Sequence, residues 1–244
     1  MKFKAPLTEA ILLKRHFRFL VDVALRNNKR RVLYCPNLGA IRQCDVLGTR
    51  IWYSNSNRLS QGYLDTWELA EVNGGWLVLV NPLHSNVLVR EALELGIIPE
   101  LQGFQFLQSG VIPKVGNGVE LLIRNSDEQC FMHIEPVLWS DEAKNGYFPE
   151  EPGMGYSALM DLIALKEMGH RAVLFYCVQH NGIQTLRTND LIDPAYGKVL
   201  REAVAKGVEI LAYRASINCR EIILNTPIPV LLSENIISHS QRSF

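Results

Sequence analysis

Short apolar runs separated by turn residues fill the first third of the chain. Residues 17–25 alternate in part and stop at Asn27-Asn28-Lys29, and residues 31–35 follow as a second predicted strand. Further strands are predicted at 50–54, 67–72 and 76–80, the last two joined by the turn Asn73-Gly74-Gly75. About five short strands of this kind predict a small closed barrel of the OB type.

The pattern changes beyond Pro82, where helical spacing of apolar residues begins to alternate with strand-like runs. Helices are predicted at 86–95, 157–168 and 194–206, each followed at once by a glycine suited to a helix C-terminus. Strands are predicted at 120–123, 130–135, 172–178 and 208–213. Such alternation predicts an α/β domain built around a mixed sheet.

These patterns divide the chain into two domains and a tail. Residues 1–82 are predicted to form an OB-like β-barrel, and residues 83–232 an α/β domain. Residues 233–244 are polar and carry no capping signal, which is typical of a loose tail.

Charge separates along the same boundary although the chain has 25 basic and 25 acidic residues in total. Up to residue 85 there are 12 basic and 6 acidic residues, against 13 and 19 in the remainder. A basic module joined to an acidic one suggests polyanion binding by the first, and a chance imbalance on a solvated surface is the other reading.

The five cysteines are scattered and form no Cys-x-x-Cys pair, which argues against a disulfide framework and a zinc ribbon. No apolar run is long enough for a signal peptide or a membrane span, so the cytoplasm is the expected location and no membrane partner is expected.

Several short motifs occur in an order and spacing that together are specific. The clearest are Cys35-Pro36-Asn37, Thr66-Trp67-Glu68 and the run from Gly207 to Tyr213. With these motifs the chain resembles the sugar fermentation stimulation protein A family over residues 17–230 or so. The resemblance implies an OB-like barrel that binds DNA, a second domain of the restriction-endonuclease (PD-(D/E)xK) type, and a link to the regulation of sugar metabolism.

In that family an acidic residue and a Glu-x-Lys on the next strand hold a divalent metal, Mg²⁺ or Mn²⁺, and activate water. Here the matching positions are Glu120, His133 and Glu135, so the resemblance implies a degenerate catalytic site. Glu120 and His133 are the metal ligands that remain, and no cofactor is required by this reading. Glu135 places a negative charge where the family lysine stabilises the phosphate.

Other departures from the family concern basic residues and a further carboxylate. The segment 60–65 replaces a Lys-Arg-Lys run, Gly110 falls near a further family glutamate, and the stretch after Phe148-Pro149-Glu150 has lost its basic residues. Hydrolysis is therefore expected to be lost or nearly lost.

The remaining basic residues of the barrel are the candidate phosphate contacts, and the expected partner is DNA, or RNA, bound with little sequence selectivity. They are Lys14, Arg15, Arg18, Lys29, Arg30 and Arg31. His84 and His180 lie beside turns and are expected at the surface.

Two alternatives stay open. One is an active nuclease with a rearranged Glu120, His133 and Glu135 site, whose mixed ligands suit Mn²⁺, Zn²⁺ or Fe²⁺. The other is an interaction protein that binds no nucleic acid. A homodimer is compatible with each reading.

Overall fold

The computed structural model describes residues 1–55, 65–109 and 119–232. The predicted tail at 233–244, Gly110 and nearly all of the segment that replaces the family's basic run lie outside these ranges. No helix in the described ranges is long and apolar enough to cross a membrane.

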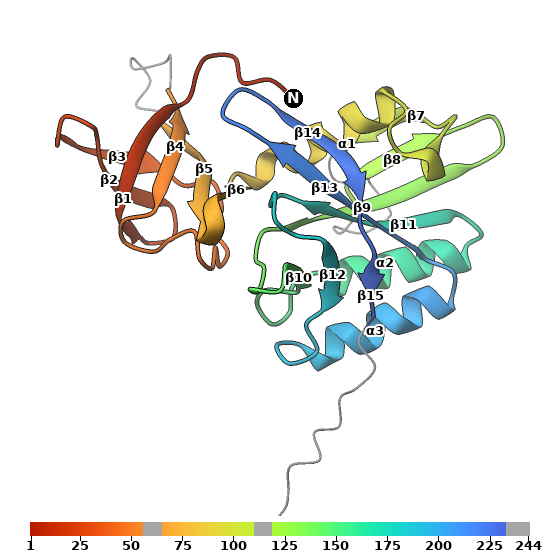
Figure 1. Ribbon diagram of the computed structural model, residues 1–244. Coiled ribbons are helices and arrows are strands. Elements are labelled where there is room, and N and C mark those ends of the chain that lie inside the picture. The colour runs from red at the N-terminus through yellow and green to blue at the C-terminus, as the bar shows by residue number, and fades with distance from the viewer. Residues whose placement is uncertain (56–64, 110–118, 233–244) are drawn as a thin grey trace, which may run out of the picture.

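Six strands form the first domain: β1 (Thr8–His16), β2 (Leu20–Ala24), β3 (Arg30–Tyr34), β4 (Arg50–Ser54), β5 (Thr66–Val72) and β6 (Trp76–Leu79). They are ordered β3-β2-β1-β4-β5-β6, and a parallel contact between Tyr34 and Thr66 joins β3 to β5. This contact closes the sheet into a barrel, on the left of Figure 1. Val21, Leu33 and Trp67 are fully buried inside it.

The strand predicted at 17–25 is wrong in its first part. Phe17 and Arg18 have positive φ values of 50° and 67° and form the turn between β1 and β2, with Phe17 80% exposed. The preceding strand β1 was not predicted, because a bulge between Leu12 and Lys14 breaks the alternation of its side chains.

The second domain is built on a six-stranded mixed sheet ordered β14-β13-β11-β9-β8-β7. Its strands β9, β11 and β13 run parallel and the others pair antiparallel. The elements are α1 (Ser85–Glu94), β7 (Gln105–Ser109), β8 (Leu121–Arg124), β9 (Gln129–Val137), α2 (Tyr156–Glu167), β11 (Arg171–Val178), α3 (Pro194–Ala205), β13 (Glu209–Ile217) and β14 (Ile222–Pro227). The three predicted helices lie within two residues of these bounds.

Smaller elements complete the domain. A three-stranded sheet orders β10 (Asn145–Phe148), β12 (Thr185–Thr188) and β15 (Val230–Leu231), and short 3-10 helices occupy η2 (Asn73–Gly75), η3 (Pro82–His84) and η4 (Pro99–Leu101).

The large sheet is covered on both faces, and its strands are therefore apolar on both sides. One core packs α2 and α3 against side chains such as Phe131 and Leu174. The other packs α1 against Met132 and Val173, and it also takes in Trp52 and Leu69 from the barrel. The outer side of β4 and β5 is thus the part of the barrel that contacts the second domain.

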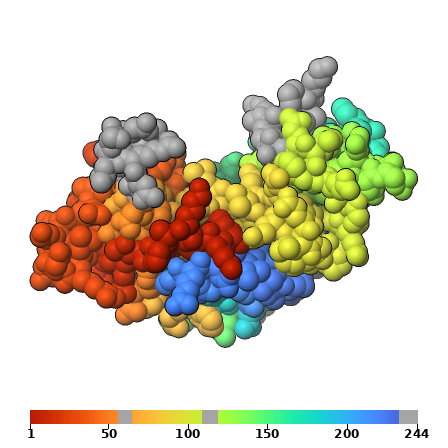
Figure 2. Space-filling view, turned by 90° about the horizontal axis from the view of Figure 1, so that it is seen from above, coloured from red at the N-terminus to blue at the C-terminus, as the bar shows by residue number. Residues whose placement is uncertain are grey.

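Backbone hydrogen bonds also join the two domains. The Leu79 N–H donates to the Gln179 carbonyl (2.9 Å), and the Asn181 N–H donates to the Leu77 carbonyl (3.0 Å). Strand β6 therefore pairs with the residues that directly follow β11. At the start of the chain the Phe3 N–H donates to the Arg220 carbonyl (3.1 Å). Figure 2 shows these first residues lying against the blue strands of the second domain.

A buried carboxylate stands where the barrel meets α1. Glu68 is 5% exposed, and its oxygens accept hydrogen bonds from Ser54 Oγ (2.7 Å), Asn81 Nδ2 (2.9 Å) and His84 Nε2 (2.9 Å). Burial raises the pKa of Glu68, but these bonds outweigh it and the net pKa is lowered. The Glu68 carboxylate therefore stays ionised and holds β4, β5 and η3 together.

The surface placement expected of His180 is wrong, and His84 is only partly exposed. His84 bonds to Glu68, and His180 is 1% exposed, accepting from the Gly182 N–H (2.9 Å) and bonding Ser140 Oγ (3.2 Å). Burial lowers the pKa of His180 to about 4, so it is neutral near pH 7. Turn residues in sequence do not reveal that the two domains meet there.

Replacing Glu68 by Ala should lower the free energy of unfolding by about 3 kcal/mol, because three polar partners lose their acceptor. The control is Glu71→Ala on the same strand, whose ion pair with Arg50 (3.3 Å) is partly exposed and should contribute within about 1 kcal/mol. Urea denaturation near pH 7 measures both. Equal small losses would show that the Glu68 cluster does not stabilise the junction.

Candidate functional site

The three residues predicted for the degenerate catalytic site lie together on β9 and at the entry to β8. Glu120 precedes β8, and its N–H donates to the Met132 carbonyl (3.1 Å), which places it beside His133. His133 and Glu135 alternate along β9 with Met132 and Ile134, so their side chains share the face covered by α2 and α3. We call Glu120, His133 and Glu135 the acidic cluster.

Within the acidic cluster the histidine is bonded to a carboxylate. His133 Nε2 donates to Glu135 Oε1 (2.8 Å), and both side chains are buried. Glu120 is half-buried; burial raises its pKa, His133 lowers it, Glu135 raises it, and a hydrogen bond with the Asn86 side chain lowers it, with a net upward shift. No lysine or arginine is among the described charged groups that act on Glu120.

Two tyrosines and a glycine enclose Glu135. Tyr176 Oη and Tyr196 Oη are 2.6 Å apart, and burial together with the charge of Glu135 raises the pKa of both phenols. Gly155, with φ +71°, caps the start of α2, and a Cβ there would lie 2.6 Å from Glu135 Oε1. The backbone therefore approaches the carboxylate more closely than any side chain would allow.

The donor set does not fit a divalent metal as it stands. In the described part of the chain no group of three His, Cys, Asp or Glu residues is arranged to hold a metal ion. The His133 imidazole and the Glu135 carboxylate are hydrogen-bonded to one another, whereas Mg²⁺ prefers an octahedral set of oxygen atoms. A metal would have to break this hydrogen bond.

Glu150 is a third buried carboxylate, placed between the barrel and the second domain. Its Oε1 accepts from the N–H groups of Leu138 (3.2 Å) and Trp139 (3.1 Å), while its Oε2 is buried with no hydrogen-bond partner in the described chain. Burial raises the pKa of Glu150 to about 7, against the lowering effect of these N–H groups and of Arg42.

The six basic candidates of the barrel divide into two groups of three. Arg15 donates to the carbonyls of Asn37 (2.6 Å) and Gly39 (3.1 Å), and Arg31 pairs with Asp65 (2.6 Å). Arg18 donates to the Leu38 carbonyl (3.2 Å) and lies 3.6 Å from Glu151. For the exposed Lys14, Lys29 and Arg30, no ion pair is found in the described ranges.

Strand register explains this division for the four candidates that lie on strands, because residues directly opposite one another in a sheet share a face. Across β1, β2 and β3 the outward rows are Ile11–Ala24–Arg30, Lys14–Asp22–Val32 and His16–Leu20–Tyr34. We call these nine residues the outer face. Arg15 and Arg31 lie instead opposite Val21 and Val23, which are fully buried in the barrel core.

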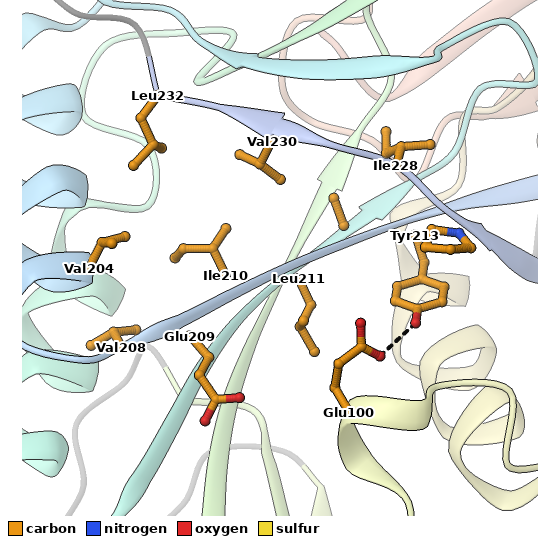
Figure 3. A pocket seen from close by; sticks show the side chains of 12 residues that line it. Glu100, Val204, Val208, Glu209, Ile210, Leu211, Tyr213, Ile228, Val230 and Leu232 are labelled. Atoms are coloured by element: carbon orange, nitrogen blue, oxygen red, sulfur yellow. Dashed lines mark hydrogen bonds between the residues drawn. The ribbon is translucent and has the colours of Figure 1, made fainter.

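A cavity of about 500 Å³ lies beside the first half of β13, away from the acidic cluster (Figure 3). Its lining is mostly apolar, with Ile210, Val230 and Leu232 pointing inward. Its two carboxylates are engaged, Glu100 with the Tyr213 hydroxyl (2.7 Å) and Glu209 with Arg171 (2.7 Å). The lining offers little to a phosphate or a metal ion.

Several residues around the acidic cluster were not predicted from the sequence. Asn86, Gly155, Tyr176 and Tyr196 come from four separate elements, and only the fold brings them to Glu120 and Glu135. Gly155, just before α2, is the residue whose type could have indicated a close approach of the backbone. Among the tryptophans of the barrel, Trp76 alone is more than slightly exposed, at 36%.

Comparison with known proteins accounts for nearly the whole chain. Residues 13–80 match the family model described as the SfsA N-terminal OB domain, and residues 83–221 match the sugar fermentation stimulation protein RE domain. Curated sugar fermentation stimulation protein homologs from Teredinibacter turnerae and Pseudomonas aeruginosa are 38% and 40% identical over 95% of this chain and all of their own length.

A solved structure has the same fold. The chain of Pyrococcus furiosus SfsA in complex with Ca²⁺ superposes with a TM-score of 0.84 at 20% identity, covering 95% of this chain and 98% of that one. The predicted fold class, an OB-like barrel followed by an α/β domain with a mixed sheet, is confirmed.

Replacing Glu150 by Gln should flatten the pH dependence of stability between about pH 4.5 and 7. The pKa of the Glu150 carboxyl is about 7 in the folded chain and lower in the unfolded chain, so the protonated form favours folding. This contribution to stability is complete below the pKa of the unfolded chain and is lost as the pH rises through 7. The expected difference between wild type and variant across this window is about 3 kcal/mol. Urea midpoints measured at several pH values test it, and parallel pH profiles would contradict it.

Proposed function

Because this chain belongs to the sugar fermentation stimulation protein family, we propose that it binds nucleic acid and that its second domain has lost hydrolysis. The observation that carries the proposal is the hydrogen bond from His133 to Glu135, formed where the family pattern has a carboxylate and a lysine. Binding would then be the surviving activity of the molecule.

The charge of the acidic cluster supports the loss of hydrolysis. Phosphodiester cleavage needs a group that stabilises negative charge on the phosphate and on the attacking oxygen. Glu120 and Glu135 both repel a phosphate, and the described interactions of Glu120 include no cation other than His133 if protonated. The segment before α2, Gly153-Met154-Gly155, brings no basic side chain to the site.

The barrel supports the binding half of the proposal. Lys14, Lys29 and Arg30 are exposed, and they lie on β1, in the turn before β3 and on β3. Figure 1 shows β1 to β3 at the end of the barrel away from the second domain. Cations that have no acidic partner can exchange solvent counterions for phosphates at little cost. DNA, or RNA, is the proposed partner, with little sequence selectivity.

The competing reading is a nuclease with a rearranged metal site. The fact that favours it is that Glu120, His133 and Glu135 lie together, and that the related Pyrococcus furiosus protein was solved with Ca²⁺. A metal that displaced the His133–Glu135 hydrogen bond would find two carboxylates and one imidazole, a set more suited to Mn²⁺ or Zn²⁺ than to Mg²⁺.

The unmodified protein should not cleave DNA or RNA above background with Mg²⁺ or Mn²⁺, because the described residues around Glu120 offer no lysine or arginine to stabilise the phosphate. Labelled single strands and duplexes incubated with the protein and resolved on a denaturing gel measure this, with Glu120→Ala as the matched control. Metal-dependent cleavage that disappears in Glu120→Ala would overturn the proposal and establish the rearranged nuclease.

Combining His133→Glu with Glu135→Lys rebuilds the family's Glu-x-Lys order on β9. This double variant should gain measurable Mn²⁺ affinity by calorimetry, and its cleavage should stay slow because no basic side chain approaches from the start of α2. A Mn²⁺ affinity equal to that of the unmodified protein would show that the strand does not hold the metal.

Affinity for DNA should fall steeply with salt, and a triple variant that combines Lys14→Gln, Lys29→Gln and Arg30→Gln should flatten that dependence. The log–log slope should fall by about 0.9 for each duplex phosphate that the variant no longer neutralises. Arg31→Gln is the control, because the Arg31 guanidinium is paired with Asp65. An unchanged slope in the triple variant would move the binding face elsewhere.

A further inference from the structure

We propose that the outer face of β1, β2 and β3 is a platform for single-stranded nucleic acid, with Tyr34 stacking on a base and Lys14 and Arg30 contacting phosphates. This inference rests on the proposed nucleic-acid binding. It adds that the ligand is single-stranded and that Tyr34 is the residue that contacts a base. The argument begins with what leaves this part of the barrel uncovered.

The barrel uses its outer surface in two different ways. On β4 and β5, the outward Trp52 and Leu69 are buried in the core shared with α1. On β1 to β3, the outward Ile11, Val32 and Tyr34 are 38%, 43% and 38% exposed. Figure 1 places these three strands at the end of the barrel farthest from the second domain. The outer face is therefore open for a ligand.

The cross-strand rows give this face a defined pattern. Arg30 stands at one end, Tyr34 at the other, and Val32 lies between them on β3. Lys14 lies in the same row as Val32, with Asp22 between them. The Asp22 carboxylate is hydrogen-bonded to His16 (2.8 Å), so it already has a partner other than Lys14. An aromatic ring, an apolar centre and flanking cations without acidic partners in the described chain thus share one surface.

That combination favours one class of occupant. Cations favour a polyanion over a neutral protein surface, and an exposed ring favours bases whose faces are free. In a duplex the base faces are covered by their neighbours, so a tyrosine on a strand could reach only backbone or groove edges. OB-type barrels offer this region of their sheet to oligonucleotides, which agrees with the position of the face.

Register supplies the control residues. Arg31 is next to Arg30 in sequence, but it points to the barrel side, where it bonds Asp65 (2.6 Å) and lies near Tyr53. The alternation of side chains along β3 therefore puts Arg30 on the outer face and Arg31 on the other face, where its partly exposed guanidinium is already paired with Asp65. A general charge effect would not distinguish the two.

The experiment compares a fluorescent oligo(dT) with a duplex of equal length by anisotropy at low salt, using the full chain. The unmodified protein should bind the single strand more tightly. Tyr34→Val, which keeps the strand preference of the side chain, should weaken single-strand binding about 5- to 150-fold and change duplex binding less than about 2-fold. Tyr34→Phe should retain the affinity because the ring remains.

The cation variants complete the test. Arg30→Gln and Lys14→Gln should weaken binding of both ligands, and Arg31→Gln should leave them nearly unchanged. If Tyr34→Val binds the single strand as well as the unmodified protein does, or loses both ligands equally, the stacking platform is wrong while nucleic-acid binding stands. If neither ligand binds at low salt, the proposed function fails too, and the outer face would be a surface for a protein partner.

Discussion

The buried carboxylate of Glu68 is the interaction on which the arrangement of the two domains depends. It accepts from Ser54 on β4, from Asn81 after β6 and from His84 just before α1, so three segments converge on one charge. Because α1 starts at Ser85, the same cluster sets the position of Asn86, which bonds Glu120 in the second domain. An ionised group with all partners satisfied is costly to rearrange, which makes the junction rigid.

On either side of this junction the two domains present different groups of side chains. The side of the barrel that carries Trp52 and Leu69 is covered by the second domain, and the outer face of β1 to β3 is not part of that contact. In the second domain the sheet brings together two carboxylates and a histidine, and His133 is hydrogen-bonded to Glu135. The mixed sheet of the second domain thus carries a group of carboxylates without a lysine among the described interactions of Glu120, which agrees with the proposed loss of hydrolysis.

The sequence predicted a good deal of this architecture, and the physical reasons for its failures are specific. The helices at α1, α2 and α3 were found because their apolar spacing and terminal glycines are local signals. Strand β1 was missed because of its bulge, and the turn at Phe17 and Arg18 was read as strand because its residues are apolar or long-chained. His180 was misplaced because burial between domains leaves no local pattern.

The candidate site shows the same limit. The positions of Glu120, His133 and Glu135 followed from motif order, but the Tyr176–Tyr196 pair and the close approach of Gly155 come from elements far apart in the chain. Likewise, six basic residues were predicted as one group, and only the register of β1 to β3 divides Lys14 and Arg30 from Arg15 and Arg31.

Binding without cleavage is the central claim, and one sample can test both halves of it. An end-labelled single strand is held with excess protein and Mn²⁺ at low salt, its bound fraction is read by anisotropy, and the same sample is then run on a denaturing gel. The account predicts a strand that is mostly bound and still full length after prolonged incubation. A bound strand that is progressively shortened, with the shortening stopped by a chelator, would contradict it.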